Sequence, residues 1–215
     1  MENRPNARIS SRKKPKQARS NDLVSAILQA AVQVLSQEGA QRFTTARVAE
    51  KAGVSVGSLY QYFPNKAAIL FKLQSDEWRE TTNLLGDILS DTARPPFERL
   101  RALVHTFICS ECEEAAVRVA LSDAAPLYRD APEALEARHA DEPIIAQFMR
   151  EVLPEASETI RNRAGGLIMT TMSCVGKDFS EEPRSDEEIN LYADAMTEMF
   201  CAYLQRLGDK AKEPI

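Results

Sequence analysis

The stretch Phe43–Lys66, FTTARVAEKAGVSVGSLYQYFPNK, predicts two short helices joined by a tight turn and followed directly by a longer third helix. Thr44 or Thr45 can cap the first helix, because a hydroxyl oxygen there accepts an otherwise unpaired N–H of the opening turn. Gly53 tolerates the left-handed backbone with which a chain commonly leaves a helix. Ser55 can cap the second helix in the same way as the threonines cap the first.

A helix, about three turn residues with a glycine, and a second helix form the helix-turn-helix arrangement. The second helix, residues 55–62, begins with small and hydroxyl-bearing residues and carries two tyrosines further on. That order suits insertion of its N-terminal end into a major groove. An ordinary helical hairpin in an all-α core would show the same spacing, so the pattern alone leaves both interpretations open.

A longer run, TTARVAEKAGVSVGSLYQYFPNKAAIL at residues 44–70, resembles the DNA-binding signature of the TetR family of bacterial transcriptional regulators. The most diagnostic part is LYQYF at 59–63, followed by Asn65-Lys66 and a long helix. The close resemblance covers about residues 22–71. It implies an N-terminal three-helix helix-turn-helix domain and a larger C-terminal helical domain for ligand binding and dimerisation. Together with the helical pattern of the rest of the chain, we predict an all-α fold of about nine helices.

The resemblance also implies which residues contact DNA. Thr45 and Lys66 match phosphate-contacting positions, and the tip of the reading helix matches the part that approaches base edges. Val56 can contribute only apolar contact there, for example with a thymine methyl group. Leu59 and Phe63 are expected in the core instead. With Arg47 as an additional phosphate candidate exposed on the first helix, the predicted DNA-binding set is Thr45, Arg47, Val56, Gly57, Ser58, Tyr60, Tyr62 and Lys66.

Composition is that of a globular protein. The chain has 215 residues, 44% of them apolar, and a net charge of −5, which fits one large or two small domains. No window approaches the ~18 uncharged apolar residues of a membrane helix, and no apolar segment follows the charged N-terminus as in a secretory signal. We therefore expect a soluble, cytoplasmic protein without a membrane partner.

Charge is distributed unevenly along the chain. Residues 1–20 hold seven basic residues against Glu2 alone, a net charge of +6, which leaves −11 on the rest. A basic flexible arm, residues 1–19, thus precedes the predicted helix-turn-helix. Such an arm can bind phosphates or enter a minor groove; a solvated tail without contacts is the alternative.

The helical periodicity continues to the C-terminus, and no convincing period-two strand is present. We predict a helix-turn-helix domain at 20–66 and a regulatory and dimerisation domain at 67–215. Within this scheme a helix that stops at Gly39 precedes the helix-turn-helix, and a helix that Pro143 kinks or splits runs from Pro132 to Leu153. The expected helices span about 20–38, 45–52, 55–62, 66–90, 97–109, 115–123, 132–153, a segment starting at Pro154, and 186–207.

The last two helices are more apolar than one partner face requires. They are either core helices of the C-terminal domain or, as the resemblance implies, half of a four-helix bundle in a homodimer. Gly165 and Gly166 would allow close backbone approach in such a bundle. The side chains that we expect at this interface are Tyr192, Met196, Met199 and Tyr203. A dimer also agrees with the short reading helix, because two-fold dimers read paired half-sites.

By resemblance, the C-terminal domain binds an unidentified small-molecule effector that releases DNA. Apolar bulk with a few polar groups is typical of such pockets, although the same residues at helical spacing also make ordinary cores. The candidate ligand-binding residues are Trp78, His105, Phe107, Tyr128, Phe148, Met149, Met169 and Met172. A TetR-like protein that acts without a ligand, as an architectural or protein-binding DNA factor, is the alternative.

Little in the sequence suggests catalysis or a metal. Only two histidines are present, and no nucleophile elbow, glycine-rich phosphate loop or zinc-protease motif occurs. Cys109 and Cys112 form a C-S-E-C pair on a predicted helix, but no second pair lies at metal spacing. We expect that the protein is not an enzyme and that it has no metal site and no cofactor. Buried thiols or a thiol-reactive switch both remain open for the cysteines.

Overall fold

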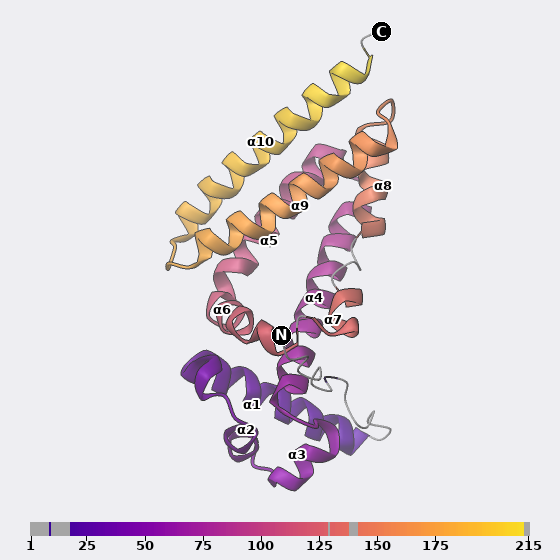
Figure 1. Ribbon diagram of the computed structural model, residues 1–215. Coiled ribbons are helices and arrows are strands. Elements are labelled where there is room, and N and C mark those ends of the chain that lie inside the picture. The colour runs from indigo at the N-terminus through magenta and orange to yellow at the C-terminus, as the bar shows by residue number, and fades with distance from the viewer. Residues whose placement is uncertain (1–8, 10–17, 129, 138–141, 213–215) are drawn as a thin grey trace, which may run out of the picture. The chain divides into compact units, whose positions relative to one another are not determined.

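The computed structural model describes residue 9 and residues 18–128, 130–137 and 142–212 (Figure 1). Over these ranges the chain forms ten α-helices and one short 3₁₀ helix, with no strand. The all-α prediction is therefore confirmed, with ten helices where about nine were expected.

The helices group into two compact units. The first unit comprises residues 1–79 and 116–139, and the second comprises residues 80–115 and 140–215. The division thus falls inside α4, and a segment that follows α5 returns to the first unit. The functional partition at residue 66 remains a prediction, because compactness alone does not test it.

The first unit contains the helix-turn-helix. Its α1 leaves the helical backbone at Gly39, where φ is 74° and ψ is 171°, in agreement with the predicted stop. Its helices are α1 (Ala18–Arg42), α2 (Thr45–Lys51), α3 (Val56–Tyr62), the first part of α4 (Lys66–Ser90), nearly all of α6 (Ala115–Ala124), the 3₁₀ helix η1 (Ala125–Leu127) and α7 (Pro132–Ala137).

The core of the first unit joins the helix-turn-helix to the segment after α5. Phe43, Leu59 and Phe63 are completely or almost completely buried, as predicted for the last two. Side chains of α6 and α7 complete the same cluster, with Leu121 among them. Ile9 is also buried in this cluster; residues 1–8 and 10–17, most of the predicted arm, lie outside the described residues.

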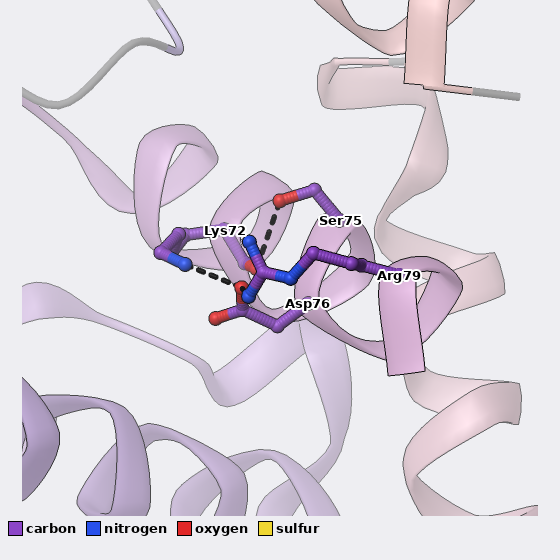
Figure 2. A network of polar contacts seen from close by, with 4 residues as sticks. All are labelled: Lys72, Ser75, Asp76 and Arg79. Atoms are coloured by element: carbon purple, nitrogen blue, oxygen red, sulfur yellow. Dashed lines mark hydrogen bonds and ion pairs between the residues drawn. The ribbon is translucent and has the colours of Figure 1, made fainter. Parts of the chain in front are cut away.

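Polar contacts reinforce α4 within the first unit. Asp76 accepts hydrogen bonds from Lys72, one turn earlier, and from Arg79, three residues later (Figure 2). The hydroxyl of Ser75 donates to the carbonyl of Lys72 at 3.1 Å (Figure 2). Pairs at these spacings stabilise a helix by a few tenths of a kcal/mol each, ~0.2–0.5.

A second polar network ties α4 to α6 and to Tyr128. The Tyr128 hydroxyl points at the Leu121 carbonyl, 3.1 Å away, and at Gln74 Oε1, 3.3 Å away. Gln74 donates to Glu77 at 2.7 Å, and Arg118 forms an ion pair with Glu77 at 2.7 Å. The segment after α5 is therefore held to α4 by directed bonds as well as by apolar packing.

The second unit is a helical bundle built around α5. This helix packs against both α9 and α10, and α8 packs against α9. Two glycines permit close approach: a Cβ on Gly165 would lie 2.8 Å from Ile145 of α8, and one on Gly176 would lie 3.0 Å from Phe107 of α5. The helices are the remainder of α4, α5 (Pro96–Glu113), α8 (Glu142–Val152), α9 (Glu158–Ser180) and α10 (Asp186–Lys212).

A buried arginine fastens the end of α4 in this unit. Arg99, on α5, is 2% exposed. One of its guanidinium nitrogens donates to the Leu89 carbonyl, and another pairs with Glu151 of α8. The guanidinium also lies 5.6 Å from the centroid of the Phe148 ring. Because Leu89 is in the last turn of α4, this contact satisfies a carbonyl that the helix itself leaves unpaired.

One predicted helix boundary was wrong. The last helix passes through Gly208 and continues to Lys212, because a glycine inside a well-packed helix costs only about 1 kcal/mol and need not end it. The segment from Pro132 to Leu153, which Pro143 was predicted to kink or split, forms two helices, α7 and α8, and Pro143 is the second residue of α8.

Candidate nucleic-acid interface

Side-chain caps position α2 and α3. Thr44, not Thr45, caps α2: its hydroxyl oxygen accepts the Arg47 N–H at 3.3 Å. Gly53 has a φ of 67°, the left-handed value predicted for the turn. Ser55 then caps α3 by accepting the Ser58 N–H at 3.0 Å. These local bonds determine where each short helix begins.

Because Thr44 provides the cap, the Thr45 hydroxyl is available for a contact with α3. Thr45 Oγ1 lies 3.1 Å from the Tyr60 hydroxyl oxygen, and this hydrogen bond joins the two helices at their exposed surface. Tyr60 is 38% exposed and Val56, one turn earlier, is 39% exposed. Thr45, Val56 and Tyr60 therefore form one outward-facing cluster, which we call the α2–α3 face.

The tip of α3 is open at its backbone. Gly57 is exposed, and a Cβ there would meet only the Ser55 hydroxyl, at 3.8 Å. The Ser58 hydroxyl is 2.8 Å from that of Ser55, so it is already engaged in the cap. A ligand that approached this tip would meet the backbone of Gly57 and the methyl groups of Val56 before it met the Ser58 hydroxyl.

Lys66 is the first residue of α4 and is partly exposed. Asn65 caps this helix, because its side-chain oxygen accepts the Ala68 N–H at 2.9 Å. The lysine therefore lies beside the remaining N–H groups of a 25-residue helix, where the helix dipole favours an anion.

Two predicted residues are placed differently from the rest. Tyr62 is only 6% exposed and belongs to the core cluster of the first unit, which indicates that most of its ring serves packing. The Arg47 side chain reaches solvent as predicted, but its guanidinium forms an ion pair with Glu38 of α1. This side chain is 42% exposed and that of Glu38 is 30% exposed.

The structure adds Gln61 as a further exposed polar residue of α3. This residue is exposed on α3, four residues after Gly57. A glutamine amide can bond an adenine edge in a bidentate manner. Its place next to Tyr60 in a seven-residue helix was visible in the sequence, but only burial separates it from Tyr62. The Glu38–Arg47 pair was also not predicted, because it joins two helices and no local spacing in the sequence indicates it.

The eight predicted ligand-binding residues divide between the two units. Trp78 and Tyr128 lie in the first unit, and the other six lie in the second. Four of those six are buried core residues: Phe107, Phe148, Met149 and Met172. Met169 packs against the same core, and His105 bonds Asp194 of α10 at 3.0 Å. The ligand-binding assignment remains a prediction. The Tyr128 hydroxyl already forms hydrogen bonds within the first unit.

The cysteines differ in exposure. Cys109, Cys112 and Cys201 are half-buried, and burial is the main cause that raises the pKa of each thiol. A raised pKa disfavours the reactive thiolate. Cys174 is exposed on α9. Among the described residues, no group of three or more histidine, cysteine, aspartate or glutamate side chains could hold a metal ion.

Exposed apolar residues lie on both α9 and α10. On α10 the exposed residues Leu191, Ala195, Met199 and Ala202 recur at three- and four-residue spacing. On α9, Leu167 is exposed, and a Cβ added to the neighbouring Gly166 would have nothing within 4 Å. We call this set the α9–α10 face.

The residues predicted for a subunit interface do not all lie on the α9–α10 face. Met199 does, and Gly166 does. Met196 is buried in the core, and Tyr192 stacks on Phe179 with ring centroids 3.9 Å apart. Gly165 faces α8 of the same chain.

Two known families match the chain. Residues 27–73 match the family of bacterial regulatory proteins called the tetR family. Residues 95–207, more than half of the chain, match the tetracyclin repressor-like C-terminal domain. In the described part of the chain, no helix is long and apolar enough to cross a membrane.

A known protein is similar to part of the chain. The nucleoid occlusion factor SlmA of Vibrio campbellii is 39% identical over 83 residues, which span 38% of this chain and 42% of that protein. The matched part is thus less than half of that relative.

Solved structures of the same fold cover most of the chain. A protein described as a TetR-family transcriptional regulator from Mesorhizobium loti has a TM-score of 0.67 at 18% identity, covering 87% of this chain and 98% of that one. The fatty acid degradation regulator FadR from Bacillus halodurans has a TM-score of 0.65 at 18% identity, covering 87% and 96%. At this identity the likeness concerns the fold alone.

Proposed function

The chain belongs to the TetR family of bacterial regulatory proteins, and we propose that it represses transcription in the cytoplasm by binding palindromic operator DNA as a homodimer that a small-molecule effector releases. No step of this activity is enzymatic. The observation that carries the proposal is the α2–α3 face, in which the Thr45–Tyr60 hydrogen bond connects the two helices of the helix-turn-helix.

The α2–α3 face and its sequence neighbours Gly57 and Lys66 offer two kinds of contact. Lys66 supplies an ammonium donor, and the Thr45 and Tyr60 hydroxyls, which are hydrogen-bonded to each other, are further groups for phosphate oxygens. Such contacts position the protein on a duplex. Val56 and Gly57 supply a methyl surface and an open backbone, which suit the edges of bases in the major groove. The Ser58 hydroxyl is hydrogen-bonded to the Ser55 hydroxyl. It must replace this hydrogen bond with one to a base if it contacts DNA.

Salt dependence separates these two kinds of contact. Binding of a selected duplex and a random duplex is measured by fluorescence anisotropy at several salt concentrations. Lys66→Ala should weaken both complexes and reduce the slope of log K against log salt by about 0.9, the value for one phosphate contact. Val56→Ala should change the preference among selected sequences with little change in slope. Lys210→Ala, at an exposed lysine of α10, is the matched control.

The result for Lys66→Ala is decisive for its assignment. A slope equal to that of the parent protein would exclude a phosphate contact at this position.

The homodimer is proposed from the α9–α10 face. Leu191 and Met199 are large apolar side chains exposed on one stripe of α10, and exposed apolar patches commonly mark interfaces. Gly166 on α9 leaves room for close approach of another helix. One short reading helix covers few base pairs, so two copies related by a two-fold axis would provide the specificity.

Sedimentation equilibrium tests this interface. Met199→Asp places a charge in the proposed contact and should weaken the dimer at least about ten-fold, equivalent to 1.4 kcal/mol. Leu84→Asp introduces the same charge at an exposed apolar residue of α4 and should leave association unchanged. Cysteine cross-linking provides a second readout, since Cys174 is exposed on α9. Dimers of undiminished affinity in Met199→Asp would place the interface elsewhere.

A second candidate function is favoured by one comparison. The relative SlmA is named a nucleoid occlusion factor, which suits a DNA factor that works through a protein partner and without an effector. Release of the operator complex by compounds from a metabolite panel would support the effector-controlled repressor. Persistence of the complex with every compound, together with capture of a specific protein by the DNA-bound dimer, would support the second candidate.

A further inference from the structure

Glu38 of α1 and Arg47 of α2 form an ion pair. Glu38 belongs to α1 and immediately precedes Gly39, whose φ of 74° turns the chain out of the helix. Arg47 belongs to α2 and lies within one helical turn of Thr45. The carboxylate therefore comes from outside the helix-turn-helix and is directed at a cation within it.

The backbone on both sides of the pair is well anchored. Phe43, between the two residues in sequence, is completely buried. The start of α2 is set by the Thr44 cap, which accepts the N–H of Arg47 itself. The pair is thus formed between two fixed segments, and the guanidinium is held in place before any ligand arrives.

Exposure makes the pair exchangeable. The side chains are 42% and 30% exposed, so water screens their attraction. A phosphate oxygen offers a guanidinium the same charge-assisted bond that a carboxylate offers. Other charged groups on these two helices near the pair are Arg42, Glu50 and Lys51, all exposed.

We infer that Glu38 is an internal competitor for Arg47: it occupies the guanidinium in the free protein and must give it up when a DNA phosphate binds. This inference rests on the proposed DNA contact of Arg47. The competition lowers the affinity of the protein for any duplex, because each binding event breaks the pair and brings the Glu38 carboxylate toward a polyanion. Glu38 therefore limits sequence-independent binding and leaves discrimination to the tip of α3.

The test uses the full-length protein and a random-sequence duplex, so that no operator is needed. Glu38→Gln keeps the size of the side chain and removes its charge. It should tighten binding about two- to five-fold, which corresponds to about 0.4–1 kcal/mol. Arg47→Ala should weaken binding and reduce the salt slope by about 0.9. In the Arg47→Ala background, Glu38→Gln should tighten binding less than in the parent protein, because only the repulsion between the carboxylate and the phosphates remains to be relieved.

A control and a stability measurement separate this competition from other roles. Glu50→Gln removes the same charge from an exposed position of α2 and should change affinity less than Glu38→Gln. If Glu38 only fastens α1 to α2, Glu38→Gln will lower the unfolding temperature without tightening the complex.

The outcomes are distinguishable from failure of the proposed function. If Arg47→Ala leaves the affinity and the slope unchanged, the phosphate contact of Arg47 is absent and the inference falls with it. If Arg47→Ala weakens binding but Glu38→Gln has no effect, the phosphate contact of Arg47 stands and the competition is overturned. The same conclusion follows if Glu38→Gln has the same effect with and without Arg47, or if its effect equals that of Glu50→Gln.

Discussion

Replacement of each of two adjacent glycines of α9 by alanine should have opposite effects on stability. Gly165 and Gly166 are both interior helical positions with ordinary negative φ, since only Gly39 and Gly53 have positive values among the described glycines. Alanine is favoured over glycine in a helix interior by about 0.8–1 kcal/mol, and this gain applies to both variants. The difference between the variants therefore isolates what the new methyl group meets.

The packing term comes directly from the structure. A Cβ on Gly165 would lie 2.8 Å from Ile145 Cγ2 and 3.3 Å from Met149 Cγ, whereas a Cβ on Gly166 would have nothing within 4 Å. Ile145 Cγ2 is attached to the β-carbon, so it cannot rotate away as the end of a long chain could. Extra methyl groups in a packed core cost about 1–3 kcal/mol.

We expect the unfolding free energy of Gly166→Ala to exceed that of Gly165→Ala by about 1–3 kcal/mol. For a chain of this length, the difference corresponds to roughly 2–12 °C in unfolding temperature. Urea unfolding gives the free energies, and thermal unfolding gives the temperatures. Both are repeated at two protein concentrations, because a change in dimer affinity would depend on concentration and a packing change would not.

A second-site change tests the identity of the clash. Ile145→Leu moves the branch away from the β-carbon and removes the contacting methyl group, so it should restore part of the stability of Gly165→Ala. Equal unfolding free energies for Gly165→Ala and Gly166→Ala would refute the reasoning, because they would show that α8 does not press on Gly165.

Three further predictions concern single contacts. Tyr128→Phe should lower the unfolding free energy by about 1 kcal/mol, as the hydroxyl bonds to Leu121 and Gln74 are lost; an unchanged urea midpoint would contradict this. Ser55→Ala should cost about 1 kcal/mol through loss of the α3 cap and should weaken DNA binding together with the fold, as circular dichroism and anisotropy would show. The Ser185 hydrogen bonds lower the pKa of Glu188, so this contribution to stability is present above the unfolded value of about 4.3 and is lost as the pH falls through the folded value. Glu188→Gln should remove this loss of stability at low pH. If the unfolding free energies of the two proteins fall in parallel as the pH is lowered, the contribution of Glu188 is excluded.

The helices and their caps were largely predictable because their signals are local. The predicted α4, from Lys66 to Ser90, agrees with the structure, and Ser55 and Asn65 cap the helices expected of them. A cap bond spans three residues, and a helical bond spans four, so the sequence displays both partners together.

The candidate site was only partly predictable because exposure depends on packing from several segments. Tyr60 and Tyr62 are two residues apart in the same helix, yet one is exposed and hydrogen-bonded to Thr45 while the other is buried. The partner of Arg47 is Glu38, nine residues earlier on a different helix. No periodic pattern relates Glu38 to Arg47.

The sequence alone determined the all-α class, the helix-turn-helix, the resemblance to TetR regulators and the residue types at the tip of α3. These depend on hydrogen bonds and periodicities within about four residues. The fold in three dimensions assigned residues 116–139 to the same compact unit as the helix-turn-helix and turned Gly165 toward α8 but Gly166 toward open space. Such features depend on contacts between segments distant along the chain, and their free energies are settled only when all the helices pack at once.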